Sequence, residues 1–287
     1  MSLKLDLKDK KILYELDVNS RSSNTEIAKK VGLSKQVVGF RIKRLWDEKV
    51  LSNFYTVIDI SKLGYTAHKN YVRLQNLDAV KEGELIQFLK NHPKIIWLAS
   101  CDGKFDFIFS IWARNMEELD KTLAEINTKY GSYISERQLA TIIRGEYFTR
   151  DYLINKQRGG FSKSFFGSVP EPVEIDESDW KILLQLGKNS RLTAVEISEL
   201  IKTSPDMVRD RIKKLEKSGV IKHYNIVPNE SVYPYLHYKI LVGLKNLSTE
   251  KEKSIIEYCR VNPNVIYVVK ALGSWEFEID LEVESPE

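Results

Sequence analysis

Apolar positions at the start of the chain recur at helical spacing. Ile12, Leu13 and Leu16 form one stripe, which predicts a helix that begins near residue 6 or 7. The segment TEIAKKV predicts a second, short helix that is capped by Ser23 or Asn24. A third helix is predicted to begin near residue 35 and to end near residue 48.

The turn GLS separates the second of these helices from the third. Gly32 suits a positive φ angle, and Ser34 suits the N-cap of the third helix. After that helix, VLSNFYTVID alternates between apolar and polar residues, which predicts a short strand pair, the wing. Residues 1–60 are therefore predicted to form a winged helix-turn-helix unit.

Residues 61–152 follow a different pattern. HKNYVRLQ predicts a strand and AVKEGELIQFLKNHP a helix, and KIIWLAS and FDFIFSIW predict a hairpin around CDGK. MEELDKTLAEINTKY predicts another helix before a last strand, SERQLATIIRGEYF. The order βαββαβ is that of a ferredoxin-like domain.

The chain repeats this plan after a shift of 170 residues. The sequence NSR recurs at 19–21 and at 189–191, and Gly103 aligns with Gly273. A second winged helix-turn-helix is therefore expected over residues 174–230 and a second ferredoxin-like domain over residues 231–287. The expected fold class is α+β, a tandem repeat of winged helix-turn-helix and ferredoxin-like units.

Two segments of the repeat are exceptional. Residues 153–173 are rich in Gly, Ser and Pro, which predicts a linker, although its phenylalanines at 161, 165 and 166 could equally dock on a neighbouring domain. The second ferredoxin-like unit has no counterpart of the last helix and strand, so it is expected to be incomplete. We expect truncation to explain this, rather than elements supplied by another chain.

The third helix carries the candidate DNA-binding surface. Val38, Ile42 and Leu45 fall on its core face, and its opposite face is polar and basic. A helix-turn-helix inserts such a face into the major groove, where Gln can pair with adenine and an aromatic ring can contact a thymine methyl group. The residues predicted to contact DNA are Asn24, Ser34, Lys35, Gln36, Gly39, Phe40, Lys43 and Arg44. The alternative is an amphipathic helix with a merely solvated face.

The second copy of this helix keeps the core positions and changes the exposed face. Its corresponding DNA-contacting candidates are Ser204, Asp206, Arg209, Lys213 and Lys214. Carboxylates at Asp206 and Asp210 oppose phosphate binding, and the turn glycine is replaced by Lys202. We therefore expect the first copy to bind DNA more strongly. The second either reads a different half-site or serves mainly in packing.

Composition narrows the remaining functions. The net charge of +4 permits an anionic partner, and no stretch approaches eighteen uninterrupted apolar residues, so no membrane span is expected. The first residues do not resemble a signal peptide, which favours a cytoplasmic location. Cys101 and Cys259 are expected to be buried thiols, and the four histidines show no metal-ligand spacing, so neither a metal nor a cofactor is predicted.

The motifs LDLKDKKILYEL, NSRSSNTEIAKKVGLS and VVGFRIKRLWDEKVL, followed by CDGKFDF, resemble the Lrp/AsnC family of transcription regulators. The resemblance implies a ferredoxin-like domain of the RAM type that dimerises and often binds amino acids. It also implies double-stranded DNA as a partner, an amino-acid effector and a homo-oligomer formed through the ferredoxin-like domains. Family members are ordinarily single-copy chains, so here the two ferredoxin-like units could pair within one chain. The two helix-turn-helix units would then reach two half-sites, and their unequal faces predict an asymmetric operator.

In the family, the GxFD-type loop lies beside an effector pocket between paired domains. This resemblance predicts effector contacts at Asp102, Gly103, Phe105, Asp106, Gly273 and Glu276. The longer Glu276 is expected to change the depth of a second pocket. The alternative is a turn glycine with Asp106 as a solvated or structural carboxylate.

Two rival functions remain open. One is an architectural protein that binds DNA with little sequence preference. The other is an enzyme, because sirohaem decarboxylases share this pair of folds. Those enzymes use a His- and Arg-rich pocket, whereas the histidines at 68, 92, 223 and 237 are scattered in this sequence and the expected Arg- and Trp-containing run after the wing is absent.

Overall fold

The computed structural model describes residues 5–158, 164–167 and 169–284. Its first unit, HTH1, contains α1 (Leu7–Val18), α2 (Asn24–Val31) and α3 (Lys35–Asp47). Asp6, Ser23 and Ser34 cap these helices by accepting hydrogen bonds from backbone N–H groups in the first turns. Gly32 ends α2 with a φ of 66°. The predicted helices and their turn are therefore confirmed, with Ser23 rather than Asn24 as the cap of α2.

The second helix-turn-helix unit, HTH2, repeats this arrangement. It contains α6 (Glu177–Lys188), α7 (Ala194–Ile201) and α8 (Pro205–Lys217). Ser204 caps α8, and Pro205 occupies its first position, where a missing N–H costs nothing. Lys202 adopts the left-handed conformation of its counterpart Gly32, with a φ of 56°. The second copy therefore keeps the turn geometry without the glycine.

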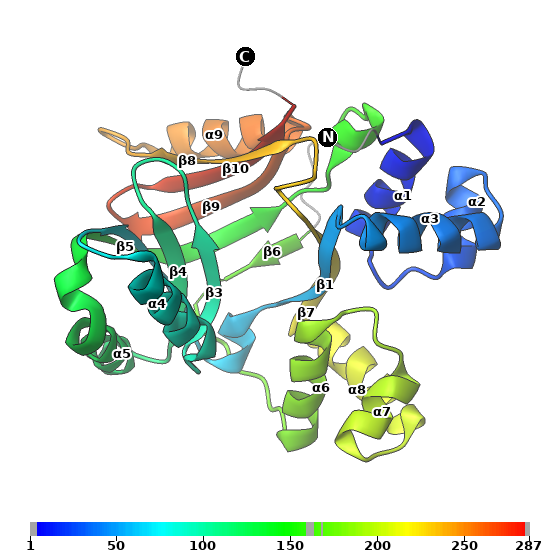
Figure 1. Cartoon of the computed structure of the whole chain (residues 1–287), viewed down its shortest axis with the longest axis horizontal. Coiled ribbons are helices and arrows are strands. Elements are labelled where there is room, and N and C mark those ends of the chain that lie inside the picture. The colour runs from blue at the N-terminus through cyan, green and yellow to red at the C-terminus, as the bar shows by residue number, and fades with distance from the viewer. Residues whose placement is uncertain (1–4, 159–163, 168, 285–287) are drawn as a thin grey trace.

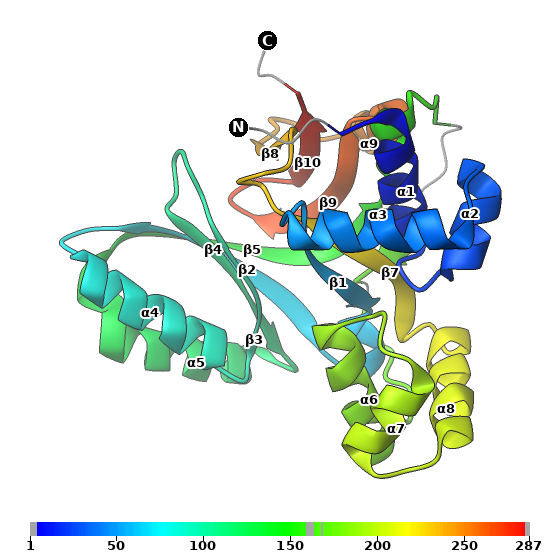
Figure 2. The ribbon, with the colours of Figure 1, turned by 45° about the vertical axis from the view of Figure 1, so that its right-hand side comes forward.

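The first ferredoxin-like unit, unit 1, has the predicted βαββαβ order. Its elements are β2 (Thr66–Leu74), α4 (Ala79–Asn91), β3 (Ile95–Ser100), β4 (Phe107–Ala113), α5 (Met116–Tyr130) and β5 (Ile134–Tyr147), with short 3-10 helices at Ile60–Leu63 (η1), Gly131–Tyr133 (η2) and Asp151–Ile154 (η3). Helices α4 and α5 cover one face of the strands (Figures 1 and 2). Phe107, Phe109 and Ile111 of β4 fill the core beneath them.

The second ferredoxin-like unit, unit 2, continues the same sheet. It contains β8 (Leu236–Val242), α9 (Thr249–Val261), β9 (Val265–Gly273) and β10 (Phe277–Val283). Across the described residues, eight strands form one sheet in the order β3-β4-β2-β5-β9-β10-β8, with β6 beside β5. Strands β5 and β9 join the units, from Ala140 opposite Gly273 to Tyr147 opposite Tyr267. The expected internal pairing of the two ferredoxin-like units is confirmed.

The strand pair predicted within VLSNFYTVID is not formed within the first unit; it is formed between the two copies. VLSNFYTVID contributes a single strand, β1 (Leu51–Ile58), which pairs with β7 (Ile221–Pro228) of the other copy. Tyr55 lies opposite Asn225, exactly one repeat later in the chain. Strand pairing depends on which edge is nearby in the fold, so alternation along one segment could not identify this partner. The strand pair of β1 and β7 therefore joins the first copy to the second (Figure 1).

Each helix-turn-helix unit packs on residues of the other copy. The core of HTH1 includes Tyr233 and Tyr235, which lie just before β8 of unit 2. The core of HTH2 includes Leu63 and Tyr65, which lie just before β2 of unit 1, with Trp112 of β4 packed against it. The two copies are therefore interlocked, with α1–α3 and α6–α8 on the same side of the sheet (Figures 1 and 2).

Part of the predicted linker is ordered against the sheet. Residues 164–166 form β6 (Ser164–Phe166), which pairs with the end of β5. The ring of Phe166 occupies the space where Gly145 lacks a side chain, since an added Cβ would lie 2.1 Å from it. Phe165 is 44% exposed, and Phe161 lies outside the described residues. Among the described residues, no helix is long and apolar enough to cross a membrane.

Candidate nucleic-acid interface

The outer face of α3 presents several of the predicted DNA contacts. Val38 and Leu45 are buried in the core of HTH1, so the opposite side of the helix faces solvent. Lys35 and Gln36 in its first turn are exposed, and Phe40 is 68% exposed. A large aromatic side chain with this much exposed surface gains little packing energy within the chain. The face therefore offers cationic, amide and apolar groups for contact with a partner.

Two arginines of α3 are held by α1. Arg41 Nη1 lies 2.7 Å from an Asp6 oxygen and 2.8 Å from Asp9, and Arg44 Nη2 lies 2.6 Å from Asp9. The carboxylate of Asp9 is almost completely buried. Hydrogen bonds to Asp6 and Asp9 raise the pKa of Arg41 above its usual value. Arg44 therefore holds α3 against α1. To contact a DNA phosphate as predicted, Arg44 would have to bind the phosphate while it stays paired with Asp9.

Two other candidates also serve the packing of α2 on α3. A Cβ added at Gly39 would lie 3.0 Å from Asn24 Nδ2, so the glycine allows the start of α2 to approach closely. In the second copy, Arg209 stands at the position of Gly39 and Ala194 at the position of Asn24. The small residue therefore lies on the second helix there, whereas in the first copy it lies on the third helix. Lys43 forms an exposed ion pair of 2.5 Å with Asp47, a contact that phosphate can displace at little cost.

The exposed face of α8 carries ion pairs like those of α3, together with the exposed carboxylates of Asp206 and Asp210. Arg209 pairs with Asp206 one turn earlier, and Lys214 Nζ lies 3.2 Å from Asp179. Lys213 is exposed and Ser204 is occupied as the helix cap. Binding phosphate at Arg209 would require breaking its pair with Asp206 or placing that carboxylate near DNA. These features agree with the expectation that α8 binds DNA more weakly than α3. Contact of either helix with DNA stays a prediction.

A pseudo-twofold axis relates the two helix-turn-helix units. Ser20 and Ser190, equivalent in the repeat, share a hydrogen bond of 2.6 Å. Arg21 donates to the Ser190 carbonyl oxygen and Arg191 donates to the Ser20 carbonyl oxygen, each at 2.5 Å. Burial, together with the nearby charge of Arg21, lowers the pKa of Arg191. Such reciprocal contacts are those of an isologous dimer interface, here formed within one chain.

The two interface arginines were missed as functional residues by sequence reasoning. Their signal was present, because NSR is retained without change in both copies while the flanking helices differ. Arg21 also lies over the ring of Tyr224 and Arg191 over the ring of Phe54, at 5.2 and 5.4 Å from the ring centroids. Both arginines therefore hold the helix-turn-helix units to each other and to the β1–β7 pair.

The predicted effector residues mostly hold the sheet together. One oxygen of Asp106 accepts a hydrogen bond of 2.6 Å from the Leu74 N–H, and Glu276 accepts the equivalent bond of 2.7 Å from Leu244. Glu276 therefore performs the same role as the shorter Asp106. These contacts favour the structural alternative, and ligand contact at either acid stays an untested prediction.

The other effector candidates divide between packing and solvent. Phe105 is buried against Tyr71 and Trp275. Gly273, with φ 151°, allows the close crossing of β9 on β5, since an added Cβ would lie 2.2 Å from a backbone oxygen. Asp102 is exposed, and Gly103, with φ 146°, has open space at its missing Cβ. Asp102 and Gly103 are thus the members of the set most accessible to a ligand.

Comparison with known proteins assigns the chain to a family. The family of winged helix-turn-helix DNA-binding domains matches residues 5–51 and 175–222. The HTH-type transcriptional regulator FL11 of Pyrococcus horikoshii is 31% identical over 123 residues, which cover 43% of this chain and 80% of that protein. The chain belongs to the Lrp/AsnC family. LrpC of Bacillus subtilis is 29% identical over 116 residues, which cover 40% of this Lrp/AsnC chain and 78% of LrpC.

The interlocked two-copy fold also has a solved counterpart. The siroheme decarboxylase NirDL superposes with a TM-score of 0.58 over 98% of this chain and 82% of that structure, at 13% sequence identity. At this identity the likeness shows a shared fold alone. The tandem arrangement within this Lrp/AsnC chain therefore has a known architectural precedent.

Proposed function

We propose that this chain is a DNA-binding transcription regulator in which one polypeptide supplies both halves of a DNA-reading pair. The proposal rests chiefly on the exposed face of α3, where Lys35, Gln36 and Phe40 project from a helix whose arginines are fixed to α1. Relatives of this chain are named as HTH-type transcriptional regulators. A preorganised helix of this kind places amide and apolar groups at the base edges.

The two halves are unequal in this proposal. The exposed face of α8 carries the carboxylates of Asp206 and Asp210 at the positions where α3 has Gln36 and Phe40, and these carboxylates oppose phosphate binding. The net charge of the two units also favours stronger binding by HTH1. Residues 5–51 contain eleven basic and seven acidic residues, whereas the equivalent residues 175–221 contain nine basic and eight acidic residues. We infer an asymmetric operator whose stronger half is read by α3.

A binding experiment with matched variants tests this proposal. Gln36→Ala and Lys43→Ala in α3 should each weaken binding to a selected duplex, and loss of one good base contact costs about 1–3 kcal/mol. The equivalent changes Asp206→Ala and Lys213→Ala in α8 should have smaller effects. Fluorescence anisotropy at one fixed salt concentration measures all four, because phosphate binding depends steeply on salt. Equal losses in both helices would contradict unequal readers.

An architectural role is the nearest alternative, because HTH1 is basic enough to bind DNA without sequence readout. It predicts equal affinity for unrelated duplexes and a response to Lys43→Ala but not to Gln36→Ala. The same anisotropy series separates the two functions. A preference for one duplex that depends on Gln36 supports the sequence-specific regulator.

Sirohaem decarboxylation is the second alternative, favoured by the likeness to NirDL over nearly the whole chain. The histidines of this chain lie in separate surroundings. His68 contacts Thr66 and Thr141, and His92 contacts Glu125. His223 stacks on Tyr147, while His237 bonds to Asp280. We therefore infer a non-enzymatic function. A shift of the sirohaem absorption spectrum on addition of the protein would contradict that inference.

A further inference from the structure

The shared sheet ends in two strands whose counterparts in the other copy are paired on both sides. Strand β2 pairs with β4 and β5, whereas its counterpart β8 pairs with β10 alone among the described residues. Strand β9 pairs with β10 and β5, whereas its counterpart β3 pairs with β4 alone in the same part of the chain. The single strand β5 therefore occupies, in the first copy, the two edges that are equivalent to the open edges of β8 and β3.

Two identical residues show how β5 changes the exposure of a strand edge. Ile96 of β3 and Ile266 of β9 occupy equivalent positions, and Ile96 is 43% exposed whereas Ile266 is fully buried. The Ile266 carbonyl oxygen accepts a hydrogen bond of 2.9 Å from the N–H of Phe148, which follows β5 directly. Trp97, beside Ile96, is exposed as well. The edge of β3 is thus apolar and open where the edge of β9 is covered by the end of β5.

In unit 1, α5 and β5 close the helix-covered face of β2. Leu119 and Ile126 of α5 pack in one core cluster with Val72 of β2. His68 and Asn70 lie on the same face of β2 as Val72, because residues two apart in a strand share a face. Both side chains are fully buried. This face of β2 therefore has no access to solvent at these positions.

The equivalent face of unit 2 is exposed and more apolar. Tyr238 and Ile240 of β8, the equivalents of the two buried polar residues, are 39% and 47% exposed. Tyr258 of α9 is also exposed, whereas its counterpart Phe88 lies 5.3 Å from Tyr130 of α5 between ring centroids. An open strand edge with apolar side chains is a surface on which another segment can pair and pack.

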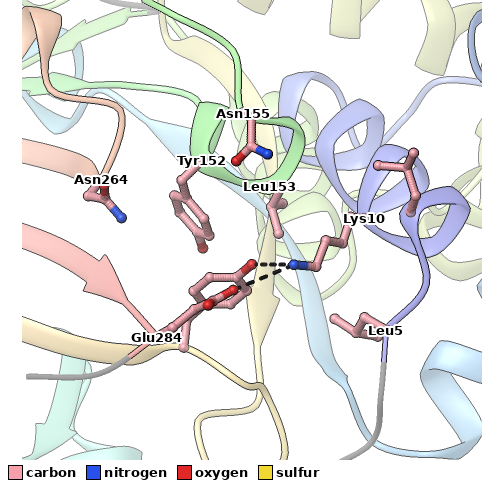
Figure 3. A pocket seen from close by; sticks show the side chains of 9 residues that line it. Leu5, Lys10, Tyr152, Leu153, Asn155, Asn264 and Glu284 are labelled. Carbon is pink, nitrogen blue, oxygen red and sulfur yellow. Dashed lines mark hydrogen bonds and ion pairs between the residues drawn. The ribbon is translucent and has the colours of Figure 1, made fainter.

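The outer side of HTH2 also lacks a cover that HTH1 has. Tyr152 and Leu153 of η3, which line the pocket drawn in Figure 3, pack in the core of HTH1 together with Tyr14 of α1. Tyr14 is buried there, whereas Leu184 of α6, at the equivalent position, is 60% exposed. The continuous segment from α5 to η3 therefore covers, in the first copy, each of the three surfaces that are exposed in the second.

The two open edges belong to the same region of the fold. Cys101, which follows β3, and Leu241 of β8 pack against one cluster that includes Tyr71 and Trp275. Strand β5 runs antiparallel to both of its neighbours, β2 of unit 1 and β9 of unit 2. The pseudo-twofold axis therefore places the edges of β8 and β3 where one further antiparallel strand can pair with both.

We propose that the edges of β3 and β8, the exposed face of β8 and the outer side of α6 form a docking surface for a helix–strand segment of a polypeptide. An amphipathic helix lies over Tyr238 and Ile240, an extended strand pairs with β8 and β3, and the residues after the strand cover Leu184. In unit 1, Thr141 of β5 shares a hydrogen bond of 2.9 Å with His68. Because Tyr238 stands at the position of His68, the docked strand carries an apolar residue where β5 has this threonine.

The probe is a labelled peptide with the sequence of residues 115–154, which spans α5, β5 and η3, and with Thr141→Val for the reason above. Fluorescence anisotropy on addition of the full chain should show saturable binding of one peptide per chain. A control peptide with Leu119→Asp and Ile126→Asp carries charges on the apolar stripe and should not bind. No saturable binding of the probe, or equal binding of the control peptide, would overturn the proposal. The experiment contains no DNA, so its outcome is independent of the proposed function.

Variants of the full chain locate the peptide. Tyr238→Lys and Ile240→Lys change exposed positions, so the chain should still fold, and each should weaken binding at least about tenfold because a lysine opposes the apolar helix. Val80→Lys is the matched control, since Val80 is an exposed apolar residue on α4 of unit 1. It should leave binding unchanged. Loss of affinity in the control, or none in the two β8 variants, would contradict the assigned surface.

Hydrogen exchange distinguishes strand insertion from other ways of binding. The peptide should slow amide exchange in residues 236–242 and in residues 95–100 together, because the docked strand pairs with both edges. Protection of residues 66–74 alone would show that the peptide replaces β5 in unit 1, and would overturn the proposal. Self-association of the chain without peptide, with protection of residues 236–242, would assign the surface to a second copy and would equally overturn it.

Discussion

Replacement of Arg150 by methionine should destabilise the attachment of HTH1 to the sheet. Arg150 follows β5, and its guanidinium lies 2.5 Å from Asp17 of α1 and makes two hydrogen bonds of 2.8 Å to Glu282 of β10. The three side chains are nearly inaccessible to solvent. Burial alone would lower the pKa of Arg150, but the charges of Glu282 and Asp17 outweigh it and hold the pKa well above the usual value. The arginine is therefore charged and bridges three elements.

The expected loss is large because the variant leaves two buried carboxylates without their cation. Removal of one partner from a buried ion pair costs about 3–5 kcal/mol. Asp17 keeps hydrogen bonds from the Tyr147 hydroxyl and from the backbone N–H of residue 150, so the lower end of that range is expected. Guanidinium titration followed by circular dichroism measures the free energy of unfolding. Methionine keeps the length of the apolar stem, so the change reports mainly on the charge.

Two further variants test the reasoning behind this magnitude. Adding Glu282→Gln to Arg150→Met removes one stranded charge, so the double variant should be more stable than the single one. Arg144→Met provides the control, because the arginine is 46% exposed, its ion pair with Glu146 is 3.5 Å long, and the buried Glu146 keeps two hydrogen bonds from Arg260. Exposed pairs contribute about 0–1 kcal/mol. A double variant less stable than Arg150→Met, or a loss no greater than that of the control, would refute the account of this buried cluster.

Three other predictions concern backbone strain, thiol reactivity and pH. Gly273→Ala should cost more stability than Gly103→Ala in thermal unfolding, because both have positive φ but only Gly273 has a backbone oxygen 2.2 Å from the added Cβ; equal costs would contradict the close crossing of β9 on β5. Cys259 should react with a thiol reagent at pH 8 only after unfolding, because burial raises its pKa to about 11, and rapid labelling of the folded protein would contradict this. Burial lowers the pKa of His237, but its hydrogen bond to Asp280 outweighs that effect and the pKa is raised overall, so its stabilisation is complete below pH 6.5 and is lost as pH rises through the folded-state value. The stability difference between the protein and His237→Gln should therefore shrink from pH 6 to pH 8.5, and a growing difference would be contrary to this sign.

The local structure could be predicted from sequence because each signal lies within a few residues. Ser34 and Ser204 cap their helices as expected, and Gly32 makes the turn. The partner of a strand carries no such signal. Segment 51–58 alternates as a wing would, but its hydrogen bonds go to residues 221–228. That choice depends on how the two copies meet, which periodicity does not encode.

Only the part of the candidate site that depends on local sequence could be predicted. The exposed face of α3 follows from helical periodicity, and Phe40 is exposed as expected. The capture of Arg44 by Asp9 was not expected, because the two residues are 35 positions apart and the contact exists only once α1 packs on α3. The resemblance to a family directed attention to Asp106, whereas the structure shows its carboxylate bonded to the backbone of β2. The packing of Tyr233 and Tyr235 on HTH1 depends on contacts between the two copies, which local sequence patterns do not reveal.

The central claim is that one chain presents two unequal DNA-reading helices. Selection of bound duplexes from a random pool, with the full chain and with its Gln36→Ala and Arg209→Ala variants, tests that claim most directly. The account predicts a motif with two unlike halves, in which Gln36→Ala removes the preference in the more strongly selected half and Arg209→Ala changes at most the other. A symmetric motif affected equally by both variants, or no enriched sequence at all, would contradict it.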